Sequence, residues 1–277
     1  MDRLLQLAVG LLVLGIILWP LERMFPSVRG KKMFRKGFRV DIIYWFFTPT
    51  VTAGFTYGVT VLTAISIIVS SGGDINGASL ASGRPPISLL PTAIQYLVAL
   101  LAADFLGYLA HRLFHTGRLW DFHAIHHASE ELDWLSAVRL HPVNQALGQV
   151  MVVAPLALLG FNLQILGATS GILTFWAIFV HSNVRWSFGP LRHVIATPAF
   201  HRWHHTSQAE GLDRNFGGLF LFWDRLFGTL YLPSGQQAQR FGLFGEEIPN
   251  SFLRQLAWPI MRRQSRNILY STAKLSE

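Results

Sequence analysis

The sequence predicts an all-α integral membrane protein built as a small bundle of transmembrane helices. The chain has 277 residues, of which 51% are hydrophobic and only 14% are charged, and it contains no Cys. Soluble domains carry about 25% charged residues, so this deficit requires long segments that stay out of water. The composition therefore excludes an ordinary soluble domain, a disordered chain, a disulfide scaffold and cysteine-based chemistry.

The first apolar segment runs from Leu4 to Leu21, which is 18 residues without a charge. At 1.5 Å per residue this is just long enough to cross a bilayer. A cleaved signal peptide is the alternative interpretation. No Ala-x-Ala-like site follows the segment, and Trp19-Pro20 is a poor cleavage context, so we predict an uncleaved first helix.

Three further apolar segments follow. Residues 42–73 carry no charge and predict one long tilted helix, bent near Pro49, and residues 85–103 form a third run that Asp104 closes. Residues 140–184 contain no Asp, Glu, Lys or Arg over 45 positions, which is too long for one crossing, and residues 160–162 read as a turn. This last segment predicts a helical hairpin, with its membrane part at about 146–180.

The distribution of basic residues predicts the topology. The loop at 22–39 holds seven basic residues, whereas residues 70–86 hold only Arg84. Those seven are Arg23, Arg29, Lys31, Lys32, Arg35, Lys36 and Arg39. By the positive-inside rule the first loop is cytoplasmic, and counting crossings places everything after the third helix, except the membrane hairpin, on the same side. The net charge of +8 fits an anionic membrane surface better than nucleic acid, which we do not expect as a partner.

All eleven histidines lie within one third of the chain, and most form three short patterns. These are an HxxxH pair at His111 and His115, an HxxHH box at His123, His126 and His127, and a second HxxHH box at His201, His204 and His205. Positions i, i+3 and i+4 share one face of a helix, so each box aims its imidazoles in one direction. Thr197 and Pro198 predict a helix start before the third box, and Gly117 predicts the end of the helix that carries the first.

This arrangement predicts a metal centre. A single histidine is more often a core residue, but eight in a pair and two triads favour metal binding. Eight nitrogens exceed the four to six ligands of one first-row ion, so the number indicates two ions, whose identity imidazole alone does not decide. His141 opens the hairpin and His181 closes it, which brings both to the same side as two more predicted ligands. His193, beside Arg192, is predicted to be a bystander.

Neutral ligands leave positive charge for nearby carboxylates to offset. The candidates are Asp104, Asp121, Glu130, Glu131, Asp133, Asp213 and Asp224. Asp104 lies seven residues before His111 on the same helical face, inside an apolar segment where an unpaired carboxylate would be costly. We assign Asp104 and Asp224 to the catalytic machinery and the remaining carboxylates to surface or capping roles.

At these residues the chain resembles the fatty acid hydroxylase/sterol desaturase superfamily of membrane-bound non-haem di-iron enzymes. The resemblance covers roughly residues 111–232. It rests on the three ordered boxes, His141-Pro142, the isolated His181, and the segments 215–217 and 223–228. It implies a cytosolic helical cap that holds two iron ions (Fe2+/Fe3+), with O2 as co-substrate.

The resemblance also implies a reaction and a division of the chain. The reaction is hydroxylation or desaturation of a sterol, fatty acyl, ether lipid or carotenoid substrate. With no fused haem domain, electrons would come from a separate reductase, ferredoxin or b-type cytochrome. Residues 1–110 would form transmembrane helices and loops, residues 111–235 the catalytic region with its hairpin, and residues 236–277 a basic amphipathic tail.

One alternative is a histidine-rich membrane metal transporter, or a metal-binding protein without oxygenase activity. It predicts ligands near the middle of membrane helices or in a flexible loop, whereas the boxes lie outside the long apolar runs. No HExxH, GxSxG, P-loop or GxGxxG motif supports another chemistry. We therefore expect a multi-pass enzyme whose active site faces the cytoplasm, with a bacterial inner membrane favoured over the endoplasmic reticulum.

Overall fold

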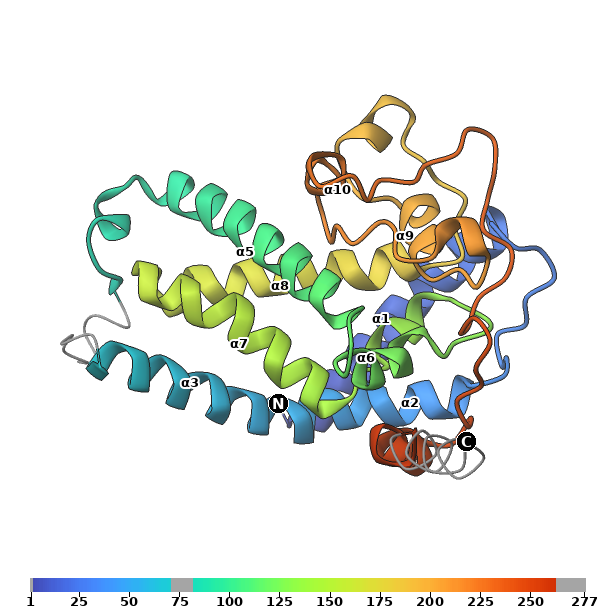
Figure 1. Cartoon of the computed structure of the whole chain (residues 1–277), viewed down its shortest axis with the longest axis horizontal. Coiled ribbons are helices and arrows are strands. Elements are labelled where there is room, and N and C mark those ends of the chain that lie inside the picture. The colour runs from blue at the N-terminus through green and yellow to red at the C-terminus, as the bar shows by residue number, and fades with distance from the viewer. Residues whose placement is uncertain (1, 71–81, 263–277) are drawn as a thin grey trace, which may run out of the picture.

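The predicted all-α class is confirmed by the architecture (Figure 1). The computed structural model describes residues 2–70 and 82–262. In these two ranges the chain forms helices and three isolated β-bridges, but no β-strand. Each bridge joins two segments around the cap, such as Pro26 to Val184 and Ile195 to Phe220.

The long helices form a bundle, and shorter ones form a cap at one end of it (Figure 1). The bundle contains α1 (Arg3–Met24), α2 (Phe38–Phe47), η1 (Thr48–Thr52), α3 (Ala53–Ser70), α5 (Thr92–Phe114), α7 (Pro142–Leu159) and α8 (Leu163–His181). The cap contains α6 (Trp120–His127), η3 (Trp134–Val138), η4 (Gly189–His193), α9 (Pro198–His204), η5 (Ala209–Gly211) and α10 (Phe222–Leu226). In the described residues α1, α5, α7 and α8 are long and apolar enough to cross a membrane.

The predicted bend near Pro49 coincides with a change of helix type. Between α2 and α3 lies η1, a π-helical turn that contains Pro49. Proline lacks an N–H and its ring collides with the carbonyl four residues earlier, so a wider turn relieves the clash. The Thr50 hydroxyl also donates to the carbonyl oxygen of Phe46 in the preceding turn. Residues 71–73 of the predicted segment lie outside the described ranges.

The predicted hairpin is formed by α7 and α8. Gly160 ends α7 with a φ of 100°, a left-handed conformation that favours glycine. The Asn162 side chain then caps α8 by accepting a hydrogen bond from the backbone N–H of Ile165 at 2.9 Å. A Cβ at Gly160 would lie 2.6 Å from the carbonyl oxygen of Arg84, so the turn packs closely against the segment that precedes α5.

Helix α1 ties the bundle to the cap. Leu18 packs with Trp45, Trp134 and Ile178 in one core cluster. The buried carboxylate of Glu22 accepts hydrogen bonds from the backbone N–H of Trp134, at the start of η3, and from that of Asn183 at 2.8 Å. The first helix therefore fixes the loops around the histidines as well as contributing apolar surface.

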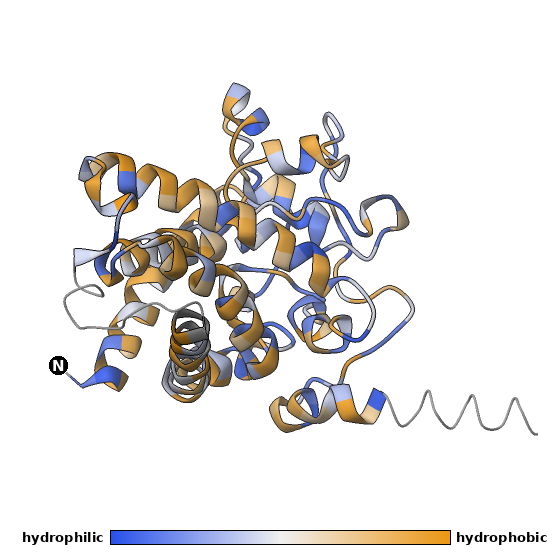
Figure 2. Ribbon diagram, turned by 60° about the vertical axis from the view of Figure 1, so that its left-hand side comes forward, coloured by the Kyte–Doolittle hydropathy of each residue, from blue (hydrophilic) through white to orange (hydrophobic). Residues whose placement is uncertain are grey.

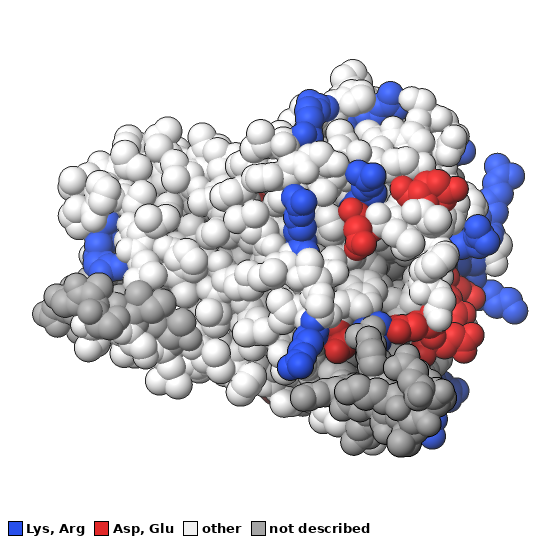
Figure 3. Space-filling view, viewed as in Figure 1, with Lys and Arg blue, Asp and Glu red and all other residues white. Residues whose placement is uncertain are grey.

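The surface of the bundle differs from that of the cap. Apolar residues run along the bundle helices (Figure 2), and on the face seen in Figure 3 the charged side chains gather over the cap. Leu12 and Ile16 on α1 are more than 60% exposed. Apolar side chains in such positions fit a helix surrounded by lipid rather than water.

The absence of cysteine allows a clean test of the predicted topology. The single-cysteine variants Lys32→Cys, Asp74→Cys and Ser276→Cys can each be labelled by a membrane-impermeant maleimide that is added to one side of the membrane. Asp74→Cys should be labelled from the opposite side of the membrane to the other two, because basic residues concentrate in the first loop. Labelling of all three from one side would contradict the topology.

Candidate metal centre

The three histidine boxes meet where the bundle joins the cap. His111 lies in the last turn of α5, and the second and third boxes lie on α6 and α9, which sit beside the ends of α5 and α8 (Figure 1). The predicted start of the helix that carries the third box is confirmed: Thr197 accepts a hydrogen bond from the N–H of Phe200, and Pro198 begins α9. The chain turns at Gly117, where φ is 51°, before α6.

Nine of the ten predicted ligands form two compact groups. Group A consists of His111, His115, His123, His127 and His204. Group B consists of His126, His181, His201 and His205. Within each group, one ring nitrogen from every member lies within 4.8 Å of the others. Both groups therefore have enough donors, at short enough range, to surround one ion each.

Adjacent histidines on one helix belong to different groups. His126 lies in group B while His127 lies in group A, and His204 and His205 divide in the same way. This differs from the prediction that each HxxHH box aims all three imidazoles in one direction. The reason is angular: neighbouring residues on a helix point about 100° apart, so one short helix can face two centres.

The spacing between ring nitrogens matches a coordination sphere. In group B the Nε2 atom of His181 lies 3.1 Å from that of His126 and 3.2 Å from that of His201. Imidazole binds a first-row ion at about 2.0–2.1 Å, so two ligands at a right angle have nitrogens about 3 Å apart. Lone pairs held at this distance repel each other unless a proton or a cation lies between them, so the geometry suits a shared cation.

The opposite ring nitrogens fix which atom is free to bind. The Nδ1 atoms of His111, His126 and His204 donate to the backbone carbonyls of Phe216, Arg139 and Arg214, at 2.9, 3.3 and 2.8 Å respectively. A carbonyl only accepts, so each Nδ1 carries the proton and each Nε2 keeps its lone pair.

Several of these free nitrogens have no hydrogen-bond partner in the described part of the chain. The Nε2 atoms of His111, His115 and His204 are buried and unpartnered. A buried polar atom without a partner costs free energy, and three that converge in one group need a common explanation. Coordination of one metal ion by group A satisfies all three.

The protonation state also suits metal binding. Burial lowers the pKa of His123, His126 and His127 well below the ordinary imidazole value, and the neighbouring rings lower it further. Burial and neighbouring rings also lower the pKa of His201, His204 and His205. The rings are therefore neutral near pH 7, which is the form that ligates a metal.

His141 is the predicted ligand that the structure does not bring to either group. Its Nδ1 accepts from the backbone N–H of Val143 at 3.1 Å, and its Nε2 donates to the carbonyl of Leu256 at 3.1 Å. The residue caps the first turn of α7, where its ring turns away towards the C-terminal helix at 252–262. His193 is exposed in η4 and also lies outside both groups.

Asn144 is a contributor that the sequence interpretation missed. It lies in the first turn of α7, and its Oδ1 accepts from Nδ1 of His123 at 2.8 Å. This bond leaves Nε2 of His123 to face Nε2 of His127, 3.2 Å away. Its position three residues after His141, at the beginning of the apolar run at 140–184, was the available signal.

Three alanine variants separate ligands from supporting residues. His181→Ala should lose metal, because its Nε2 faces both His126 and His201 in group B. His141→Ala and His193→Ala should keep the metal content of the native chain, since neither ring reaches the groups. Metal analysis of the purified proteins checks this. Loss of metal from His141→Ala, with native folding by circular dichroism, would restore it to the ligand set.

Asp104 supports the site through the backbone. From α5 its carboxylate accepts hydrogen bonds from the N–H groups of Leu219 and Phe220, at 2.7 and 3.0 Å, and from Nε1 of Trp223 at 2.9 Å. These bonds satisfy the carboxylate inside an apolar helix. They fasten the segment that follows Phe216, whose carbonyl holds His111.

Asp224 fastens the same segment from α10. It accepts from the N–H groups of Phe216 and Gly217 at 2.8 and 2.7 Å, and from the Thr229 hydroxyl. Among the hydrogen bonds of the described residues, neither Asp104 nor Asp224 contacts a histidine. Of the other candidate carboxylates, Asp213 does so, accepting from Nδ1 of His115 at 3.0 Å.

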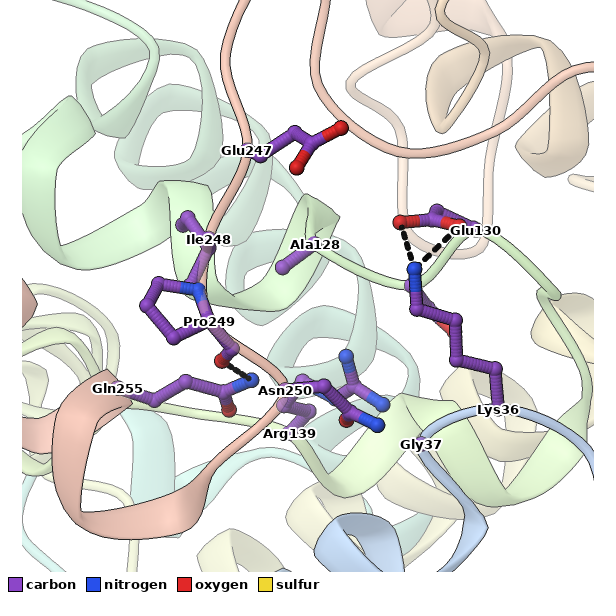
Figure 4. Close-up of a pocket in the computed structure, with 11 residues that line it drawn as sticks. Lys36, Gly37, Ala128, Glu130, Arg139, Glu247, Ile248, Pro249, Asn250 and Gln255 are labelled. Atoms are coloured by element: carbon purple, nitrogen blue, oxygen red, sulfur yellow. Dashed lines mark hydrogen bonds and ion pairs between the residues drawn. The ribbon is translucent and has the colours of Figure 1, made fainter.

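A buried ion network lies beside group B. The carbonyl of Arg139 holds His126, and its guanidinium pairs with Asp41 of α2 at 2.6 Å. Asp41 also pairs with Arg35 at 2.7 Å, and Arg35 reaches Asp133 next to η3. Figure 4 shows Arg139 at the edge of a polar pocket of about 220 Å3. The network joins the first loop, α2 and η3 to a histidine of the centre.

The fold and the site together define a helical membrane protein with a buried centre that can hold two metal ions. Residues 96–229 match the model of the fatty acid hydroxylase family. This match bears out, over these residues, the resemblance that the sequence indicated.

The chain is also similar to curated proteins. It is 35% identical to the ornithine lipid hydroxylase OlsE of Rhizobium tropici, over 65% of this chain and 54% of that protein. It is 33% identical to the alkylglycerol monooxygenase of Homo sapiens, over 47% of this chain and 29% of that protein. A rice very-long-chain aldehyde decarbonylase is 27% identical over 57% of the chain and 27% of its own length. The chain thus spans about half or less of these relatives, and no solved structure matches it significantly.

Proposed function

We propose that this chain is a membrane-bound non-haem di-iron oxygenase that hydroxylates or desaturates a lipid. The observation that carries the proposal is the pair of histidine groups, whose neutral rings present converging, unpartnered nitrogens. Group A and group B would each hold one iron ion, with nine histidines as ligands in place of the ten expected. The two ions would supply the oxidising chemistry with O2 and electrons from outside the chain.

The chain's own residues would hold and shield that chemistry. Backbone carbonyls and Asn144 orient the ligands, and Asp104 and Asp224 anchor the segment that supports His111. Every histidine of group B is buried, which excludes bulk water from its surroundings. Helices α5 and α8 run from the centre into the apolar bundle, the direction from which a lipid would come.

The substrate class rests on the relatives. One is named for ornithine lipid hydroxylation and another as an alkylglycerol monooxygenase, so both names describe oxidation of a lipid. A metal transporter is less well supported, because the described histidine groups lie at the cap end of the helices rather than at their middle. The electron donor would be a separate protein, and the active site would face the cytoplasm of a bacterial cell.

Heavy-isotope O2 tests the proposal. Membranes containing the protein, supplied with iron and a reductant, should convert an endogenous lipid into a product that the His181→Ala membranes lack. Hydroxylation would carry the isotope into the lipid, whereas desaturation would remove two hydrogens without incorporating it. An unchanged lipid profile, together with metal uptake by vesicles that contain the protein, would support the transporter instead.

A further inference from the structure

A groove of about 560 Å3 lies between α3 and α7, away from the histidine groups. Its walls come from residues 53–65 of α3 and 145–157 of α7, with the start of α8 and Arg3 of α1. The two main helices run side by side from the cap end outward (Figure 1). Residues 53–65 rise over about 18 Å, so the groove follows much of one apolar helix.

The lining changes character along this length. Val61, Ile65, Val153 and Leu166 form the end away from the cap, where no polar group is needed. Gln145, Gln149 and Thr56 line the end nearest the cap. A ligand that matches this gradient has a hydrocarbon chain at one end and hydrogen-bonding groups at the other.

Two polar atoms at the cap end have no partner in the described part of the chain. Thr56 is 4% exposed, and its Oγ1 is buried without a hydrogen bond. The Oε1 atom of Gln145 is likewise buried and unpartnered. Among membrane helices water is scarce, so such atoms are costly unless a ligand satisfies them. A hydroxyl group can accept from Thr56 or donate to Gln145, which makes it a suitable complement.

The cap end of the groove carries a positive charge. Arg3 is the single charged residue among the described residues that line the groove. Its Nη2 donates to the carbonyl of Pro49, which holds the side chain at the mouth. A guanidinium has five N–H donors and matches the geometry of a phosphate, and no carboxylate in the lining competes for it.

We infer that this groove binds one anionic, hydroxyl-bearing phospholipid of the membrane. Arg3 pairs with the phosphate, Thr56 and Gln145 contact polar groups of the lipid, and one acyl chain lies between α3 and α7 towards Leu166. None of the nine histidines lines the groove, so the site stands independently of the proposed oxygenase activity.

Competition between two lipids tests the site. The purified chain in detergent is incubated with equimolar phosphatidylglycerol and phosphatidylcholine of identical acyl chains, and bound lipid is counted by native mass spectrometry. The native chain should retain one lipid, with phosphatidylglycerol favoured about tenfold. Both lipids carry a phosphate, but phosphatidylcholine adds a quaternary ammonium that Arg3 repels and has no headgroup hydroxyl for Thr56 or Gln145. Arg3→Gln should lose most of this preference.

Two neighbouring residues provide a matched pair of variants. Val61→Trp fills the groove and should lower retained lipid about tenfold, since a bulky ring displaces the acyl chain. Leu62→Trp adds the same ring one residue away, where the side chain is 65% exposed and outside the groove, and should leave retention unchanged. Ile65→Trp is a second filling variant if Val61→Trp folds poorly. Equal retention in filling and control variants, or equal uptake of both lipids by the native chain, would overturn the inference.

Discussion

Replacing His126 or His204 with alanine should lower the iron content below two ions per chain and abolish lipid turnover. Each variant removes one ligand from a different group, His126 from group B and His204 from group A. Residues that only support a metal ligand typically cost 10–100-fold when mutated, so loss of a ligand should reduce turnover by more than about 100-fold. Elemental analysis and product formation from the lipid extract measure the two effects.

The two variants should also differ from each other. Group B keeps three histidines in His126→Ala, whereas group A keeps four in His204→Ala. Four nitrogens still suffice for one first-row ion, so His126→Ala should lose the larger share of its iron. His193→Ala serves as the control, because this exposed residue lies outside both groups. Two full equivalents of iron in both ligand variants would refute the assignment of the groups.

The second large effect concerns stability. Asp41→Ala should destabilise the protein by about 3–5 kcal/mol, the usual cost of leaving a buried partner charge uncompensated. Asp41 is fully buried and pairs with both Arg35 and Arg139, so its loss leaves Arg139 without its paired carboxylate and Arg35 with Asp133 alone. Chemical unfolding in detergent, followed by circular dichroism, gives the change in the free energy of unfolding.

An exposed ion pair of the same region provides the comparison. Lys36 and Glu130 lie 2.8 Å apart, but both side chains are more than half exposed. Glu130→Gln should therefore cost less than about 1 kcal/mol. If the two variants unfold with the same free energy, the buried network contributes no more than a surface pair, and its proposed role in holding Arg139 and His126 is wrong.

Features set by local sequence could be predicted, and those set by long-range contacts could not. The first helix, the hairpin turn at Gly160 and the cap at Thr197 depend on neighbouring residues, and the structure contains each of them. The helix of the third run differs from its predicted bounds, because α5 begins at Thr92 and continues past Asp104. Spacing also selected eight histidines that the fold brings together, and the end of the hairpin selected the ninth, His181. The position of His141 depended instead on contact with Leu256, more than one hundred residues away, which no spacing reveals.

The carboxylates illustrate the same limit. Asp104 was selected because an acidic residue in an apolar helix needs a partner, and that reasoning is sound. The partners are backbone N–H groups more than one hundred residues later in the chain, which a residue pattern does not identify. Asn144 was missed because a polar residue in the first turn of a helix is ordinary until the fold places it against His123.

The division of adjacent histidines between the two groups has a consequence for metal loading. When an ion binds group A, it immobilises His127 and His204. Their chain neighbours His126 and His205 belong to group B, so the backbone that carries these two rings is immobilised as well. Binding of the first ion therefore lowers the conformational entropy that the protein must lose to bind the second. Iron titration of the metal-free protein should accordingly be sigmoidal, with a half-loaded species that stays scarce throughout the titration.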